Sequence, residues 1–323
     1  MTAPGSAWPF GPVAPDGLPY HRIQEAGRPG VWRPLAGIVL MFLGFVAIGA
    51  VVATVVFAII YAVTGQGAVD VTELADLKHP TPAGLAFLNV ALATFIPLAM
   101  VGSRLLHGIP PRWLASVRPR IRWRYLFACL AVSVVALAAT LVAGALVPGQ
   151  GGDVGGQTNA FTSTTFHYLL VIVFLTPFQA AGEEYLFRGY LTQAIGGMFG
   201  SAWVAVLVPA FLFGLAHGLG QSPPVFFDRF AFGVVAGILV IRTGGLEAGI
   251  AMHVLNNFVA YGVALAFGDM ASTLNPTGSD WWNIPVTLTQ SLVYLWLAVA
   301  VCRRMGLSTS TRGRVLEAPR SRV

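Results

Sequence analysis

The sequence predicts an all-α polytopic membrane protein: a transmembrane helical bundle of about eight spans with both termini cytoplasmic. Of its 323 residues, 56% are hydrophobic and only 10% are charged, whereas soluble domains carry about 25% charged residues. The apolar residues come in long blocks, and a bilayer core about 30 Å thick requires ~20 apolar helical residues to cross it. Because lipid offers the backbone no hydrogen-bond partners, these blocks must be helices. They cover residues 37–63, 85–106, 125–147, 167–190, 202–218, 225–241, 248–267 and 284–302.

The segments outside the blocks give the domain organisation. Residues 1–34 are rich in Pro and Gly and lack apolar periodicity, so we expect a flexible cytoplasmic tail. The first block is far longer than the ~7–15 apolar residues of a cleaved signal peptide. Residues 35–303 form the predicted transmembrane domain, and residues 304–323 form a basic cytoplasmic tail.

The basic residues orient the predicted bundle. With the amino end inside, Lys78 and Arg229 alone among the 19 lysines and arginines fall on the outer side, in agreement with the positive-inside rule. The net charge is +6, but basic residues beside membrane spans indicate contact with anionic lipid rather than with nucleic acid. Cys129 and Cys302 form no disulfide framework and lack metal-site spacing.

Ionisable groups inside a membrane are costly and usually face a partner or a water-filled cavity. The first such group is Glu183-Glu184-x-x-x-Arg188 at the end of the fourth block. Glu184 and Arg188 are four residues apart, the spacing of an ion pair on one helical face. Glu183 points about 100° away from Glu184 and stays free. Taken alone, the motif equally fits a structural ion pair that ends the span.

Two further polar motifs follow on later blocks. Phe213 and His217 share a helical face, as do His253 and Asn257, so the second pair can donate hydrogen bonds into one cavity. Each motif alone is better explained as structural, by a satisfied histidine or by hydrogen bonds between helices. Their joint occurrence on successive helices instead indicates one site.

The ordered motifs E-E-x-x-x-R, F-x-x-x-H and H-x-x-x-N resemble the CAAX protease and bacteriocin-processing (CPBP/Abi) family. The matching core runs over residues 165–265 and departs from the family pattern at no motif position. The family includes the Ras-converting endopeptidase, a glutamate-dependent intramembrane protease that removes the last three residues of prenylated CAAX proteins. The resemblance therefore implies an intramembrane endopeptidase that needs no metal or other cofactor and acts on a membrane-associated or lipidated protein or peptide.

The resemblance also implies a role for each motif residue. Glu183 and His217 would activate a water molecule, and His253 and Asn257 would form the oxyanion hole. Glu184, Arg188 and Phe213 would support the site. The chemistry agrees, because a carboxylate in a water-poor cavity is a stronger base than in solution. In the predicted topology Glu183 and His217 lie toward opposite ends of their helices, so their convergence requires a long fourth helix or a dip at residues 191–200.

Three alternatives remain from the sequence alone. Glu183, His217 and His253 would suit a zinc site with an open water position, although the chain contains no H-E-x-x-H motif. A membrane transporter would also use buried Glu and His, but no repeated half is visible. The third is a scaffold without catalytic activity. We expect a protein of the bacterial plasma membrane whose active site lies toward the cytoplasmic side.

Overall fold

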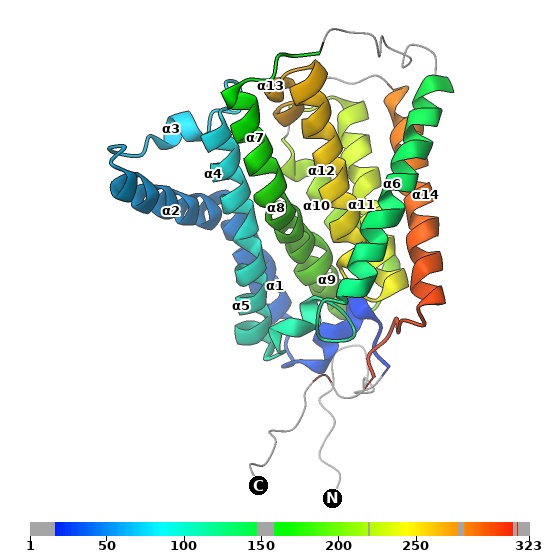
Figure 1. The fold of residues 1–323 in the computed structure, drawn as a ribbon. Helices are drawn as coiled ribbons and strands as arrows, with labels where there is room; N and C mark the ends of the chain where they lie inside the picture. The colour runs from blue at the N-terminus through cyan, green and yellow to red at the C-terminus, as the bar shows by residue number, and fades with distance from the viewer. Residues whose placement is uncertain (1–16, 147–157, 219, 277–280, 313–314, 316–323) are drawn as a thin grey trace, which may run out of the picture.

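The computed structural model of the protein describes residues 17–146, 158–218, 220–276, 281–312 and 315. This part of the chain is helical and contains no named strand, as predicted (Figure 1). Seven of its helices are long and apolar enough to cross a membrane: Trp32–Thr64, Pro82–His107, Trp123–Gly144, Ser163–Phe199, Pro223–Thr243, Glu247–Phe267 and Ile284–Arg304.

Several of these spans are divided by local changes in helix geometry. The elements are η1 (Tyr20–Ala26), α1 (Trp32–Leu43), η2 (Gly44–Ile48), α2 (Gly49–Thr64), α3 (Val71–Leu74), α4 (Pro82–Ala93), α5 (Phe95–His107), η3 (Pro111–Leu114), α6 (Trp123–Leu146), α7 (Ser163–Phe174), α8 (Thr176–Glu184), η4 (Tyr185–Leu191), α9 (Thr192–Phe199), α10 (Ala202–Ala216), α11 (Pro223–Thr243), α12 (Glu247–Phe267), α13 (Met270–Leu274) and α14 (Asn283–Arg304). The π-helical turn η2 separates α1 from α2, which packs on α4 and otherwise projects sideways from the bundle (Figure 1).

The fourth span continues past the predicted block that ends at residue 190. Helices α7, α8 and α9 follow one another through the π-helical η4 as far as Phe199. Gly200 then adopts a left-handed conformation (φ 69°), which glycine reaches without a steric penalty, and α10 returns along α9. Convergence of Glu183 with His217 required either a long fourth helix or a dip at residues 191–200. The structure has the long helix.

The eighth predicted block, residues 202–218, forms the shorter helix α10. Its 15 residues span only ~22 Å at 1.5 Å per residue, which is less than a bilayer core. The helix ends at Ala216, with His217 as its C-cap residue, so the chain leaves helical geometry inside the bundle.

Both described ends of the chain meet at one end of the bundle, which we call the basal end (Figure 1). The Leu18 amide donates to the Thr311 hydroxyl at 3.0 Å, and η1 packs on α9. The prediction of a flexible tail is therefore wrong for residues 20–26, because the Tyr20 and Ile23 side chains are fully buried there. Residues 1–16, 313–314 and 316–323 of the predicted tails lie outside the described residues. Helices α3 and α13 mark the opposite, distal end.

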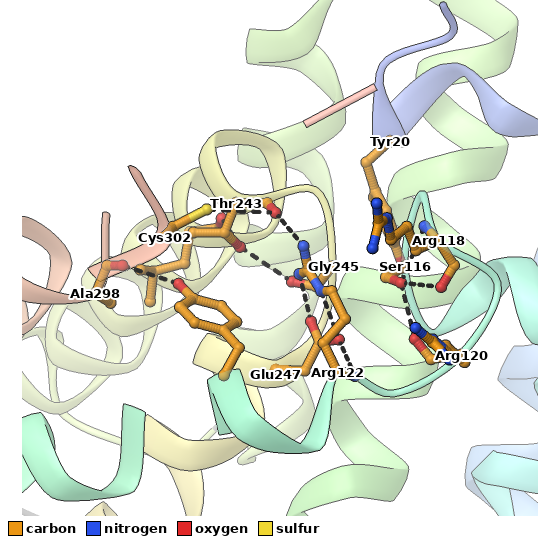
Figure 2. A network of polar contacts seen from close by, with 12 residues as sticks. Tyr20, Ser116, Arg118, Arg120, Arg122, Thr243, Gly245, Glu247, Ala298 and Cys302 are labelled. Carbon is orange, nitrogen blue, oxygen red and sulfur yellow. Dashed lines mark hydrogen bonds and ion pairs between the residues drawn. The ribbon is translucent and has the colours of Figure 1, made fainter. Parts of the chain in front are cut away.

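A buried ion pair joins two loops at the basal end of the bundle (Figure 2). The Arg122 guanidinium donates to both carboxylate oxygens of Glu247, at 2.8 and 2.6 Å, and to the Thr243 carbonyl at 2.9 Å. The Arg122 backbone amide also donates to Glu247 at 2.8 Å. The start of α6 is thereby fixed to the turn between α11 and α12, and α12 carries two of the predicted site residues.

Candidate active site

The fold brings the three motifs together from four elements. Glu183 and Glu184 end α8, Arg188 lies in η4, Phe213 and His217 belong to the end of α10, and α12 carries His253 and Asn257. A cavity of about 430 Å³ lies between them. All four side chains predicted to act in catalysis line this cavity: Glu183, His217, His253 and Asn257.

The two adjacent glutamates have different surroundings. Glu184 is fully buried and accepts hydrogen bonds from Arg188 Nη1 at 3.0 Å and from His253 Nδ1 at 3.1 Å. Glu183 instead lines the cavity. The ion pair predicted from the four-residue spacing is present, and it leaves Glu183 as the carboxylate that faces the cavity.

The His253 imidazole lies between both carboxylates. Its Nδ1 contacts Glu184, whereas its Nε2 lies 3.4 Å from Glu183 Oε2. That second separation is longer than an ordinary N–H···O hydrogen bond. An N–H at Nε2 is therefore within reach of another acceptor in the cavity.

The His217 ring is held by its own helix. Its Nδ1 lies 2.8 Å from the backbone carbonyl of Phe213, and a carbonyl only accepts, so Nδ1 carries the proton. In a neutral imidazole Nε2 is then the acceptor. His217 thus offers the cavity a hydrogen-bond acceptor, as Glu183 does.

The Phe213 side chain packs at the centre of the motifs. The Arg188 guanidinium carbon lies 4.3 Å from its ring centroid, in the range of a cation–π interaction. The same ring makes edge contacts with His217 and His253, at centroid separations of 4.6 and 6.0 Å. Phe213 is fully buried and thereby fixes the relative positions of the polar groups.

Three residues of the site were not predicted. Gln179 lines the cavity and accepts a hydrogen bond from Asn257 Nδ2 at 2.9 Å; its four-residue spacing from Glu183 was the available signal. Gln221 donates to the carbonyls of Gly214 and Gly218, at 2.6 and 2.8 Å, and so ties the segment after α10 to the last turn of that helix.

The third is Gly249, one helical turn before His253 on α12. A Cβ atom at this position would lie 2.7 Å from Glu184 Oε2. The missing side chain therefore allows the Glu184 carboxylate to lie against the backbone of α12. No pattern in the sequence indicates this contact, because it depends on how two distant helices pack.

Within the described part of the chain, no group of three or more His, Cys, Asp and Glu side chains is placed to hold a metal ion.

The cavity extends from the motif residues to the distal end of the bundle. Its rim includes Leu77, beyond α3, and Leu274 and Pro276, at the end of α13. The basal end carries the described ends of the chain (Figure 1), and His253 lies only six residues from Glu247, the basal start of α12. The predictions of cytoplasmic termini and of an active site toward the cytoplasmic side stay predictions.

Comparison with known proteins agrees with the motif analysis. Residues 164–259, which contain all three motifs, match the model of the Rce1-like type II CAAX prenyl endopeptidase family. Uncharacterized protein YyaK of Bacillus subtilis (strain 168) is 25% identical over 287 residues, covering 84% of this chain and 93% of YyaK. No solved structure gives a significant match. The predicted resemblance is confirmed over the matched segment, and at the level of the family it supports a CAAX-type intramembrane peptidase.

Proposed function

We propose that the protein is an intramembrane endopeptidase in which Glu183 is the general base. The observation that carries the proposal is that Glu183 and His217 face one cavity together with His253 and Asn257. A carboxylate and an imidazole acceptor can each accept one hydrogen of the same water molecule. Held in this way, the water directs a lone pair toward a carbonyl carbon.

The reaction then proceeds by proton transfers through Glu183. Glu183 takes one proton from the water as its oxygen attacks the scissile carbonyl, and the carbonyl oxygen becomes an oxyanion. Collapse of this intermediate breaks the C–N bond, and Glu183 returns the proton to the leaving amine. A buried, water-poor site makes the carboxylate a stronger base than in solution.

Donors for the oxyanion come from α12. Asn257 Nδ2 carries two hydrogens and donates to Gln179, which leaves one for the substrate. His253 already donates from Nδ1 to Glu184, so its Nε2 is the second donor when the ring is an imidazolium. Loss of one such donor costs about 100- to 1,000-fold in rate. Glu184 and Arg188 keep His253 in place, and the reaction uses no metal ion.

A side pocket supports an apolar or lipid-modified substrate. This pocket of about 210 Å³ lies beside the cavity and shares Phe45, Leu77, Leu88 and Leu92 with it. Apolar residues alone line it, so it suits a hydrocarbon chain or a large apolar side chain next to the cleaved bond.

The test compares purified wild-type protein with Glu183→Gln on a peptide library that includes prenylated and unmodified CAAX reporters. We expect cleavage by the wild type that persists in chelator and falls at least ~100-fold in Glu183→Gln. The matched control is Glu73→Gln, which changes an exposed glutamate of α3 and should leave cleavage unchanged.

Two outcomes would contradict the proposal. Equal cleavage by the wild type and Glu183→Gln would exclude Glu183 as the base. Cleavage abolished by chelator and restored by zinc would favour the metalloprotease reading of Glu183, His217 and His253.

A further inference from the structure

The charged residues of the two bundle ends differ sharply. Thirteen arginines of the described residues lie at the basal end or at the helix ends that meet it, whereas the basic residues described in the distal half are Lys78 and, within α11, Arg229. The distal end instead carries acids, including Asp70, Asp76 and Asp269. The basal arginines are Arg22, Arg28, Arg33, Arg104, Arg112, Arg118, Arg120, Arg122, Arg124, Arg242, Arg303, Arg304 and Arg312.

Loops rich in Lys and Arg remain on the cytoplasmic side of a membrane. The asymmetry therefore places the basal end in the cytoplasm and the distal end on the opposite side. The cavity rim at Leu77, Leu274 and Pro276 belongs to the distal end. We propose that the cavity opens at the extracytoplasmic face, so that its substrate is a membrane-anchored peptide presented from that side.

The site itself lies at intermediate depth. Glu183 lies 17 residues before Gly200, the basal turn of the fourth span, and 20 residues after Ser163, the distal start of that span. The direction in which the cavity opens therefore depends on the residues of its rim and not on the depth of Glu183. The claim that a substrate is presented from the extracytoplasmic side rests on the proposed peptidase function. The claim that the cavity opens at that face does not.

Cysteine accessibility tests the orientation without any assay of cleavage. The native Cys129 and Cys302 are buried and give a low background. Three single variants would be expressed in bacterial cells: Asn275→Cys at the distal rim, Thr309→Cys at the basal end, and Ala260→Cys in the cavity wall. Each would be treated with a membrane-impermeant maleimide, before and after the membrane is disrupted.

We expect intact cells to label Asn275→Cys and Ala260→Cys, and Thr309→Cys to react only after disruption. Labelling of Ala260→Cys that requires disruption would overturn the proposal, whatever Asn275→Cys does. A permeant maleimide applied to denatured protein confirms that each thiol is present. If labelling confirms the orientation but no peptide is cleaved, the result contradicts the proposed function and leaves the direction of the cavity supported.

A separate observation concerns Arg229 on α11. Arg229 lines the main cavity and also a pocket of about 50 Å³ that shares His217, His253 and Asn257 with it. The buried arginines Arg122 and Arg188 are paired with glutamates, whereas Arg229 is half-buried. Among the described residues, Arg229 has no carboxylate within 4.0 Å, and its Nε is buried without a hydrogen-bond partner.

An unpaired guanidinium inside a membrane domain is costly and usually has a function. The neighbouring Asp228 lines the small pocket but does not pair with Arg229, so the cation remains available from the cavity. A guanidinium binds a carboxylate through two parallel hydrogen bonds. On the premise of the proposed function, we infer that Arg229 binds the C-terminal carboxylate of the substrate and so selects bonds close to a free chain end.

The test uses three versions of one cleaved reporter: a free C-terminal acid, a C-terminal amide, and an amide with glutamate as its last residue. We expect the wild type to cleave the free acid at least ~10-fold more efficiently in kcat/KM than either amide. Arg229→Gln should lower the rate for the free acid alone and remove the preference. Arg242→Gln, at the exposed end of the same helix, should retain it.

Equal wild-type rates on the acid and the plain amide, or an unchanged preference in Arg229→Gln, would overturn the assignment to Arg229. Preference for the glutamate-containing amide would assign Arg229 to a side-chain carboxylate instead. Binding of the same peptides to Glu183→Gln, measured by thermal shift, separates this question from catalysis. Failure of the proposed function would abolish cleavage but not the difference between acid and amide in binding.

Discussion

The guanidinium of Arg188 lies 4.3 Å from the ring centroid of Phe213, so a cation of the first motif packs on an aromatic ring of the second. The other contacts of the ring reach His217 and His253. One apolar side chain therefore joins the three motifs that supply the candidate catalytic groups.

Replacing Phe213 by leucine should weaken both stability and activity. The substitution keeps an apolar group of similar length but removes the ring, and a desolvated cation–π interaction contributes about 2 kcal/mol. We expect a lower Tm in detergent and a lower kcat, because the His217 ring loses its support. Phe226→Leu removes a ring that packs on Phe211 and Phe230, and it should leave kcat unchanged. Equal effects of the two substitutions would contradict the prediction.

Substitutions of Glu183 and of Glu184 should differ in their effects on stability and on activity. Glu184→Gln leaves the buried Arg188 without a counterion, and breaking a buried pair costs about 3–5 kcal/mol. Glu183→Gln removes a carboxylate that has no such partner, so it should abolish activity while changing Tm little. Thermal unfolding of both variants, beside their rates of cleavage, tests this division. The reverse ranking of Tm values would exchange the roles of the two residues.

Gly249→Ala should displace the Glu184 carboxylate, because the added Cβ would lie 2.7 Å from its Oε2. Overpacking of this kind lowers the free energy of unfolding by about 1–3 kcal/mol. His253 should also lose its alignment with the Glu184 carboxylate. Gly262→Ala on the same helix meets no atom within 4 Å and should be neutral or stabilising. The test is to measure Tm and kcat for both alanine variants. Wild-type values of both quantities in Gly249→Ala would contradict the close contact of Gly249 with Glu184.

The apolar side pocket should control the response to lipid modification. Leu88→Trp narrows the wall shared by pocket and cavity, so kcat/KM for a prenylated reporter should fall at least ~10-fold, with little change for an unmodified one. Leu170→Trp alters an exposed apolar residue of α7 and serves as control. Parallel losses on both reporters would show that the pocket does not hold the lipid.

Helical periodicity was sufficient to predict contacts within single helices. The ion pair of Glu184 with Arg188 and the ring contact of Phe213 with His217 each join residues four apart. Block lengths likewise predicted the spans, since hydrocarbon allows little besides helices. The sequence therefore indicated which residues belong to the site.

Contacts between distant segments were beyond the same reasoning. The packing of η1 on α9 and the closeness of Gly249 to Glu184 depend on how helices are offset along their axes. Periodicity gives the angle of a side chain around its own helix but carries no information on that offset. The end of the fourth span was missed for a related reason, because residues 191–199 continue the helix without a long apolar run.

The turn at Gly200 has a consequence for how this sequence can change in evolution. Glu183 and His217 are each 17 residues from it, so the two arms of the hairpin are equal in length and the side chains meet at one height. One inserted residue in either arm would shift that arm by ~1.5 Å and rotate the side chains beyond it by ~100°. Insertions and deletions between Glu183 and His217 should therefore be rejected in functional descendants, even where single substitutions at the same positions are accepted.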